Sequence, residues 1–185
     1  PLVRRLAHHA YKAGAGLVTP FYTDPEITLA RYQHAAPESF DKTTDWLFEG
    51  MAAAFDKNTA RLAVVGEDPM LLSGQNPEYV GRANQAMSKA SSPLRERITR
   101  FDINWNIIAW PGLQWAKLVF PQMSDADAQI ALAEAIFNAS RVNTSNPNEE
   151  WAVHNKNLRA RTEWLNKKNF AALHFYGEGT DLTVG

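Results

Sequence analysis

Five histidines are the residues of this 185-residue chain best suited to metal or acid–base chemistry, and their spacing forms no recognised ligand motif. No pair follows the His-Glu-x-x-His arrangement, which places two zinc ligands on one face of a helix. His8 and His9 are adjacent, and adjacent side chains on a helix point about 100° apart, so we expect this pair to face solvent rather than share a metal. The full set is His8, His9, His34, His154 and His174.

Two of these histidines lie in segments with a clear apolar pattern. His154 shares a helix face with Trp151, and a histidine on an apolar stripe is more often a hydrogen-bonded packing residue than a ligand. His174 lies in an expected strand and faces away from Leu173 and Phe175, so a covering helix or solvent can satisfy its ring. Neither position predicts a catalytic histidine.

Other motifs of catalysis and nucleotide binding are absent from the sequence. There is no cysteine, which excludes thiolate nucleophiles, disulfides and zinc knuckles. The chain has no nucleophile elbow and no Walker loop, and Gly14-Ala15-Gly16 is too short for a dinucleotide fingerprint and precedes a strand. We therefore predict no catalytic, cofactor-binding or metal-ligating residue between positions 1 and 185.

In open parallel sheets, ligands bind at the carboxyl ends of the strands, and three expected strands end in this chain at candidate positions. These positions hold Thr23-Asp24, Glu67-Asp68 and Trp110-Pro111-Gly112. A carboxylate site could form there, but Asp24 also fits a helix cap and Glu67-Asp68 fits a turn before Pro69. The cap and turn account for both spacings and are the favoured interpretation.

The six tryptophans could either bind a ligand or pack in a core or an interface. Aromatic rings can stack on sugars or bases, but Trp115 lies in a short apolar helix and Trp151 and Trp164 lie on a long one, which favours a core or an interface. The six are Trp46, Trp105, Trp110, Trp115, Trp151 and Trp164.

Charge and hydropathy exclude several classes of partner. Nineteen Lys and Arg against 20 Asp and Glu give a formal charge of −1, so we expect no electrostatic binding to nucleic acid or to anionic membrane. No apolar run approaches the roughly 20 residues that cross a bilayer. The lack of cysteine fits a reducing compartment, and the predicted location is the cytoplasm.

Helical periodicity and capping residues predict helices along most of the chain. An opening helix ends near Gly14, and a second starts with Asp24 as cap and Pro25 inside, or with a capping box from Thr23 to Glu26. The other expected helices span 45–57, 76–100 with an interruption at Ser91-Ser92-Pro93, 113–120, a segment capped by Ser124, and 146–168.

Strands are expected at 17–22, 60–65, 105–110 and 170–176, and they alternate with the helices. This order predicts an α/β fold with three layers, in which helices cover both faces of a mainly parallel sheet. We expect residues 1–185 to form a single α/β domain. Pro1 at the first position, and an apparent strand from Thr180 that ends before anything can pair with it, predict truncation at both ends.

The segment from Asn104 to Pro121 carries a family resemblance. It contains an Asn-Trp pair, a strand ending in proline, a Trp-Ala pair and a closing Phe-Pro, and in these features it resembles metal-dependent aminopeptidases of the aminopeptidase T type, which include the AmpS and PepS enzymes of bacteria. Further matching segments follow in the same order along essentially the whole chain: Ala10 to Ala15, Asp24-Pro25-Glu26, Gly66 to Pro69, Ala135-Ile136-Phe137, Arg141-Val142, Trp151 with His154-Asn155, Glu163 to Asn166, and Gly179 to Leu182.

The resemblance implies an exopeptidase that removes N-terminal residues from peptides with two divalent metal ions, zinc or cobalt, which polarise the scissile carbonyl and supply a bound hydroxide. The family's glutamate, histidine and aspartate ligands belong to a C-terminal catalytic domain beyond Gly185. This chain would be the N-terminal domain, a scaffold that docks on its own catalytic domain and contributes to a homodimer.

Two other functions remain open on the sequence alone. The chain could be a free-standing α/β module that binds a ligand at Asp24 and Glu67-Asp68, or an interaction scaffold whose aromatic residues bind a partner protein. An intact sheet with polar edges would favour the ligand-binding module, and an exposed apolar face would favour the peptidase domain.

Overall fold

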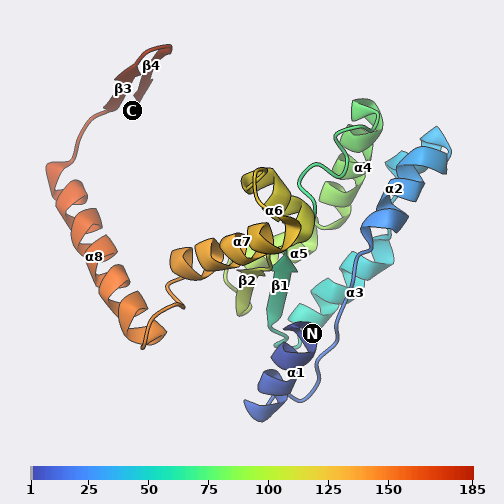
Figure 1. Cartoon of the computed structure of the whole chain (residues 1–185), viewed down its shortest axis with the longest axis horizontal. Coiled ribbons are helices and arrows are strands. Elements are labelled where there is room, and N and C mark those ends of the chain that lie inside the picture. Colours follow the sequence, from blue (N-terminus) through green and yellow to red (C-terminus); the bar gives the residue numbers. More distant parts are fainter. Residues whose placement is uncertain (1) are drawn as a thin grey trace. The chain divides into compact units, whose positions relative to one another are not determined.

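The computed structural model describes residues 2–185, and the chain divides into two compact units, Pro1–Trp115 and Ala116–Gly185. Each unit combines helices with one two-stranded sheet (Figure 1). The predicted α/β class is confirmed. That residues 1–185 form a single domain stays a prediction.

The first unit is built from helices around a short parallel sheet. Its helices are α1 (Leu2–Lys12), α2 (Pro25–His34), the 3₁₀ helix η1 (Pro37–Asp41), α3 (Asp45–Phe55), α4 (Pro77–Ala90) and α5 (Ser92–Thr99), while α6 (Leu113–Val119) spans the boundary between the units. Every helix expected in this part of the chain is present. Pro1, on which the predicted N-terminal truncation rests, lies outside the described residues.

The predicted caps explain where two of these helices start. Asp24 accepts hydrogen bonds from the backbone N–H groups of Glu26 and Ile27, with Pro25 at the first helical position. Asn76 accepts from the N–H of Glu78 in the same way. Asp24 is thus the cap of α2, and the capping-box alternative from Thr23 is not the one adopted.

The sheet of the first unit pairs β1 (Arg61–Val65) with β2 (Trp105–Ala109) in parallel, in register from Arg61 opposite Trp105 to Val65 opposite Ala109. Beside it, Phe55, Leu94 and Ile103 form a buried cluster, against which Phe48, Met51 and Ile98 pack. The cluster joins α3 and α5 and continues to Ile103, two residues before β2.

A second packing centre surrounds η1, where the sequence predicts only a loop around Pro37. Phe40 is fully buried, and its ring stacks between Tyr32 of α2 and Tyr79 of α4, with centroids 5.2 and 4.8 Å away. The short helix therefore ties α2 to α4 through one aromatic side chain.

The second unit contains α7 (Asp125–Ala139), α8 (Pro147–Lys168), and the antiparallel hairpin of β3 (Leu173–Gly177) and β4 (Thr180–Val184). Ser124 and Asn146 cap α7 and α8 as predicted, accepting from the N–H groups of Asp127 and Glu149. No residue of α8, β3 or β4 is buried, although α8 spans 22 residues.

Two strand predictions are wrong in detail. Residues 17–22 are not a strand: Pro20 lacks a donor, and the N–H of Val18 is bonded to the Tyr11 hydroxyl rather than to another strand. The expected strand at Thr180 does find a partner, because the turn at Gly179, with φ +72°, folds it back on β3. The strands thus form one parallel pair and one antiparallel pair, where the sequence predicts one mainly parallel sheet.

Candidate functional site

The carboxyl ends of β1 and β2 lie side by side, as expected for a parallel pair, and the backbone is crowded there. The N–H of Trp110 donates to the carbonyl of Val65 at 2.7 Å. A Cβ placed on Gly66 would collide with the carbonyl oxygen of Trp110, and one on Gly112 with the carbonyl oxygen of Gly66. Only glycine fits these two positions without a shift of the backbone.

The carboxylates near this edge are occupied by local turns. Glu67 accepts a hydrogen bond from the N–H of Gly66 at 3.2 Å, and Asp68 accepts from the N–H of Met70 at 2.8 Å. Asp24 serves as the cap of α2. The cap and turn interpretation is confirmed, and no bond joins these three carboxylates into one site among the described residues.

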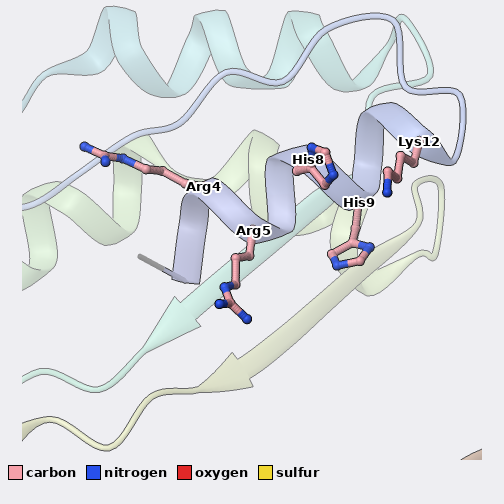
Figure 2. A pocket seen from close by; sticks show the side chains of 5 residues that line it. All are labelled: Arg4, Arg5, His8, His9 and Lys12. Carbon is pink, nitrogen blue, oxygen red and sulfur yellow. The ribbon is translucent and has the colours of Figure 1, made fainter.

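Two of the histidines form part of a basic face on α1. Arg4, Arg5, His8, His9 and Lys12 line an open surface hollow of about 350 Å³, and all five are exposed. Figure 2 shows that they spread outward from the helix and do not converge on one point. The imidazole rings of His8 and His9 are 5.9 Å apart, edge to face. Both residues are exposed, which agrees with the solvent-facing prediction.

His154 has the packing role predicted for it. Its Nδ1 lies 3.1 Å from Nη2 of Arg141, and its ring meets that of Trp151 edge to face at 5.5 Å. The indole N–H of Trp151 donates to the carbonyl of Ser140. Arg141, Trp151 and His154 thus fasten the start of α8 to the end of α7.

His174 is paired with a residue that sequence reasoning did not single out. Its Nε2 lies 2.7 Å from Oδ1 of Asp181, across the β3–β4 hairpin. The two residues lie diagonally, because Asp181 is directly opposite Tyr176. Both side chains are exposed, and the pair stabilises the hairpin register.

The histidines and carboxylates do not assemble into a metal centre. Across residues 2–185, no group of three or more His, Asp or Glu side chains is arranged to hold an ion. Two-metal sites need such clusters of nitrogen and oxygen ligands. The described residues therefore do not fit a metal pair, and we derive no step of chemistry through one.

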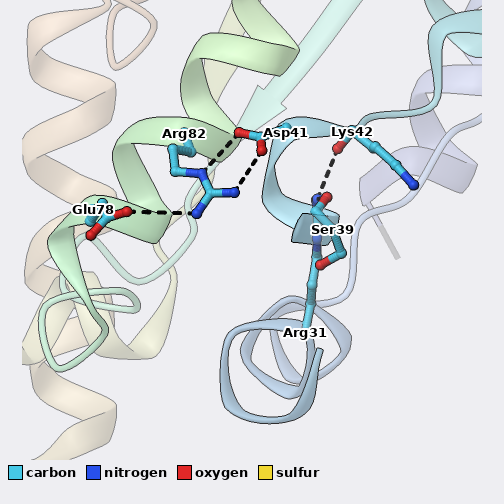
Figure 3. Close-up of polar contacts among 6 residues, drawn as sticks. All are labelled: Arg31, Ser39, Asp41, Lys42, Glu78 and Arg82. Atoms are coloured by element: carbon cyan, nitrogen blue, oxygen red, sulfur yellow. Dashed lines mark hydrogen bonds and ion pairs between the residues drawn. The ribbon is translucent and has the colours of Figure 1, made fainter. Parts of the chain in front are cut away.

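A polar network around η1 and α4 holds helices of the first unit together (Figure 3). Arg82 of α4 donates through Nε and Nη2 to Asp41 at 2.9 and 2.6 Å, and Nη1 lies 3.6 Å from Glu78. These hydrogen bonds hold the pKa of Asp41 below its ordinary value. Arg31 donates to the backbone carbonyls of Ser39, in the middle of η1, and Lys42, directly after it, which ties α2 to this short helix.

A matching pair joins α3 to α5. Arg97 donates to Asp56 through Nε and Nη2 at 2.6 and 2.7 Å and also to the carbonyl of Pro93. The two hydrogen bonds from Arg97 lower the pKa of Asp56. Both bidentate pairs connect residues 41 positions apart, so they are structural ties between helices.

One feature that sequence reasoning missed is a cleft between α3, α4, α5 and the start of β1. It has a volume of about 480 Å³ and lies entirely in the first unit. Apolar and polar residues both line it: Phe48, Met87, Leu94 and Ile98, with Arg61, Asn84, Ser88, Ser91 and Arg95. No spacing in the sequence connects residues 48, 61 and 95, so only the tertiary structure could show the cleft.

Comparison with known proteins places the chain in a class. It matches the family described as thermophilic metalloprotease (M29) over residues 1–185. It is 46% identical over 183 residues to aminopeptidase T of Thermus thermophilus and 35% identical over 182 residues to aminopeptidase AmpS of Bacillus subtilis. These matches cover 99% and 98% of the chain, but 45% and 44% of the relatives.

The fold of this chain is also that of a solved relative. Wild-type AmpT from Thermus thermophilus superimposes with a TM-score of 0.89 and 45% identity, over 99% of this chain and 45% of that one. The fold and these relatives place the chain among the metallopeptidases. It belongs to the thermophilic metalloprotease (M29) family, as the motifs between Asn104 and Pro121 suggested. The chain spans about 45% of the length of the curated relatives it matches.

Proposed function

We propose that this chain is the N-terminal scaffold domain of a metal-dependent aminopeptidase that removes N-terminal residues from peptides. The observation that carries the proposal is the continuous match of 99% of the chain to aminopeptidase T over 45% of that enzyme's length. The metal ions, zinc or cobalt in the resembling family, would be held by residues outside positions 1–185. The chain itself would contribute no catalytic residue.

The charged residues of the chain support a scaffold role, because they form structural contacts between helices and within turns. Arg82 with Asp41, and Arg97 with Asp56, tie helices together, and the strand-end carboxylates complete local turns. Large apolar side chains on the uncovered α8 and hairpin, such as Trp164 and Phe175, are 58% and 51% exposed. A catalytic domain docked against such side chains would remove them from water.

The remaining expectations belong to the same proposal. The partners would be the chain's own C-terminal catalytic domain, a peptide substrate and a second copy in a homodimer, in the cytoplasm. Within residues 2–185, the structure contains no helix long and apolar enough to cross a membrane.

Hydrolysis of aminoacyl-p-nitroanilides by the intact protein tests the proposal, with residues 1–185 alone as the control. We expect activity only from the intact protein, loss of activity on chelation, and recovery when cobalt or zinc is restored. Absence of hydrolysis by the metal-loaded intact protein on several aminoacyl substrates would overturn it. Activity of residues 1–185 alone would instead refute the scaffold assignment.

A further inference from the structure

The cleft between α3, α4 and α5 combines an apolar floor with a cationic rim. Its apolar lining comes from four side chains, of which Leu94 is buried while Met87 remains 47% exposed. The volume of about 480 Å³ lies in the range of small-molecule sites, roughly 300–1,000 Å³. The space is therefore sufficient for a small organic ligand with an apolar part.

The charges around the cleft are of one sign. Arg61 and Arg95 are its only ionisable lining residues, and no carboxylate lines it. By contrast, Arg82 and Arg97 each have an aspartate 2.6 Å away, Asp41 and Asp56. The cleft thus lacks the counter-charge found beside those two arginines.

The two cleft arginines differ in how they are held. Arg95 donates to the hydroxyl and the carbonyl oxygen of Ser88, at 2.9 and 2.8 Å, which fixes its guanidinium while leaving donors free. Arg61 is half-buried at the start of β1, and its backbone N–H donates to the carbonyl of Asn104. Across residues 2–185, the Arg61 guanidinium has no hydrogen-bond or ion-pair partner in the structure.

We propose that this cleft binds a small organic carboxylate, with the carboxylate at Arg61 and Arg95 and an apolar tail over Phe48, Met87 and Ile98. A guanidinium presents paired donors that match the two oxygens of a carboxylate. The apolar floor distinguishes this ligand from inorganic phosphate, which has nothing to place there. The absence of acids disfavours a cation, including the ammonium group of a free amino acid. The inference goes beyond the proposed function and does not depend on it.

Calorimetric titration of the intact protein with hexanoate tests the charge and the tail together. Hexanamide serves as the neutral control of the same length, hexylammonium as the cationic control, and acetate or phosphate as anions without the tail. We expect binding of hexanoate alone, weakened by added salt because a charge pair is screened. Equal binding of hexanamide, or no binding of hexanoate, would overturn the proposal.

Substitution locates the site. Arg61→Gln should weaken hexanoate binding by about tenfold, the effect of losing a hydrogen bond to a charged group. Arg61→Lys should retain part of the affinity, because the charge remains while the paired donors are lost. Arg100→Gln removes the same charge from an exposed side chain outside the cleft and should leave the affinity unchanged.

A second variant tests the site independently in case Arg61→Gln impairs folding. Met87→Trp adds bulk to the apolar end of the cleft from a half-exposed position and keeps both charges. It should abolish hexanoate binding while the thermal unfolding midpoint stays near that of the wild type. Unchanged binding in both Arg61→Gln and Met87→Trp would show that hexanoate binds elsewhere and would refute the assignment.

Discussion

At the scale of single residues, the pairs Arg97–Asp56 and Arg82–Asp41 make stability depend on pH. Each arginine lowers the pKa of its aspartate through two hydrogen bonds to the carboxylate. The unfolded chain then binds more protons than the folded chain at acid pH. The stabilisation is complete above the unfolded pKa, about 3.9, and is lost as pH falls through the lower folded pKa.

Asp56→Asn should therefore lower the urea midpoint of unfolding at pH 7, because Arg97 keeps its position but loses a charged acceptor. The difference from the wild type should shrink as the pH falls below about 4 and through the lowered pKa of Asp56, where the carboxylate becomes protonated. Equilibrium urea unfolding across this pH range measures it.

Glu49→Gln is the matched control for that experiment. It removes a carboxylate from the same helix, α3, at an exposed position with no ion pair among the described residues. We expect it to follow the wild type at every pH. A difference between Asp56→Asn and wild type that does not shrink at any pH below about 4 would contradict the role given to the Asp56 charge.

At the scale of elements, the crossing of the loops after β1 and β2 depends on two glycines. Gly66→Ala or Gly112→Ala would press a methyl group against a backbone carbonyl, and a backbone cannot move aside as a flexible side chain can. We expect each to lower the free energy of unfolding by roughly 1–3 kcal/mol, as overpacking does. Thermal or urea unfolding measures the effect.

Gly81→Ala supplies the contrast on a helix. Gly81 lies inside α4, is exposed, and has nothing within 4 Å of an added Cβ. The same substitution there should raise the free energy of unfolding by roughly 0.5–1 kcal/mol through helix propensity. If Gly66→Ala behaved like Gly81→Ala, the close approach of the two loops would be wrong.

The elements also show what local sequence can and cannot predict. Asp24, Asn76, Ser124 and Asn146 each cap the helix expected of them, because a cap depends only on residues two or three positions away. Strand pairing depends on distant partners. Residues 17–22 have strand composition but find no partner strand.

The same limit applies to the packing centres and the candidate site. Phe40 becomes a fully buried residue only because Tyr32 and Tyr79 meet around it from two other helices. The turn and cap roles of Asp24 and Asp68 follow from local spacing and were predictable. The cleft at Arg61 and Arg95 joins three helices to a strand, so no periodicity in the sequence indicates it.

At the scale of the whole molecule, the two units differ in how much of their structure is buried. The first unit contains the cluster of Phe55, Leu94 and Ile103, whereas α8 and the β3–β4 hairpin contain no buried residue. A long helix and a two-stranded hairpin without a covering layer are marginally stable in water. If the proposed scaffold role is right, the remainder of the protein covers them.

Hydrogen exchange followed by mass spectrometry, on residues 1–185 alone and on the intact protein, tests this covering. In residues 1–185 alone, the amides of α8 and the hairpin should exchange much faster than those of α3 and α5, because opening them exposes no core. In the intact protein, exchange in α8 and the hairpin should slow by about tenfold or more, while α3 and α5 change less. Equal exchange of α8 in both proteins would mean that nothing in the longer protein packs on this helix, and the docking face of the scaffold would have to lie elsewhere.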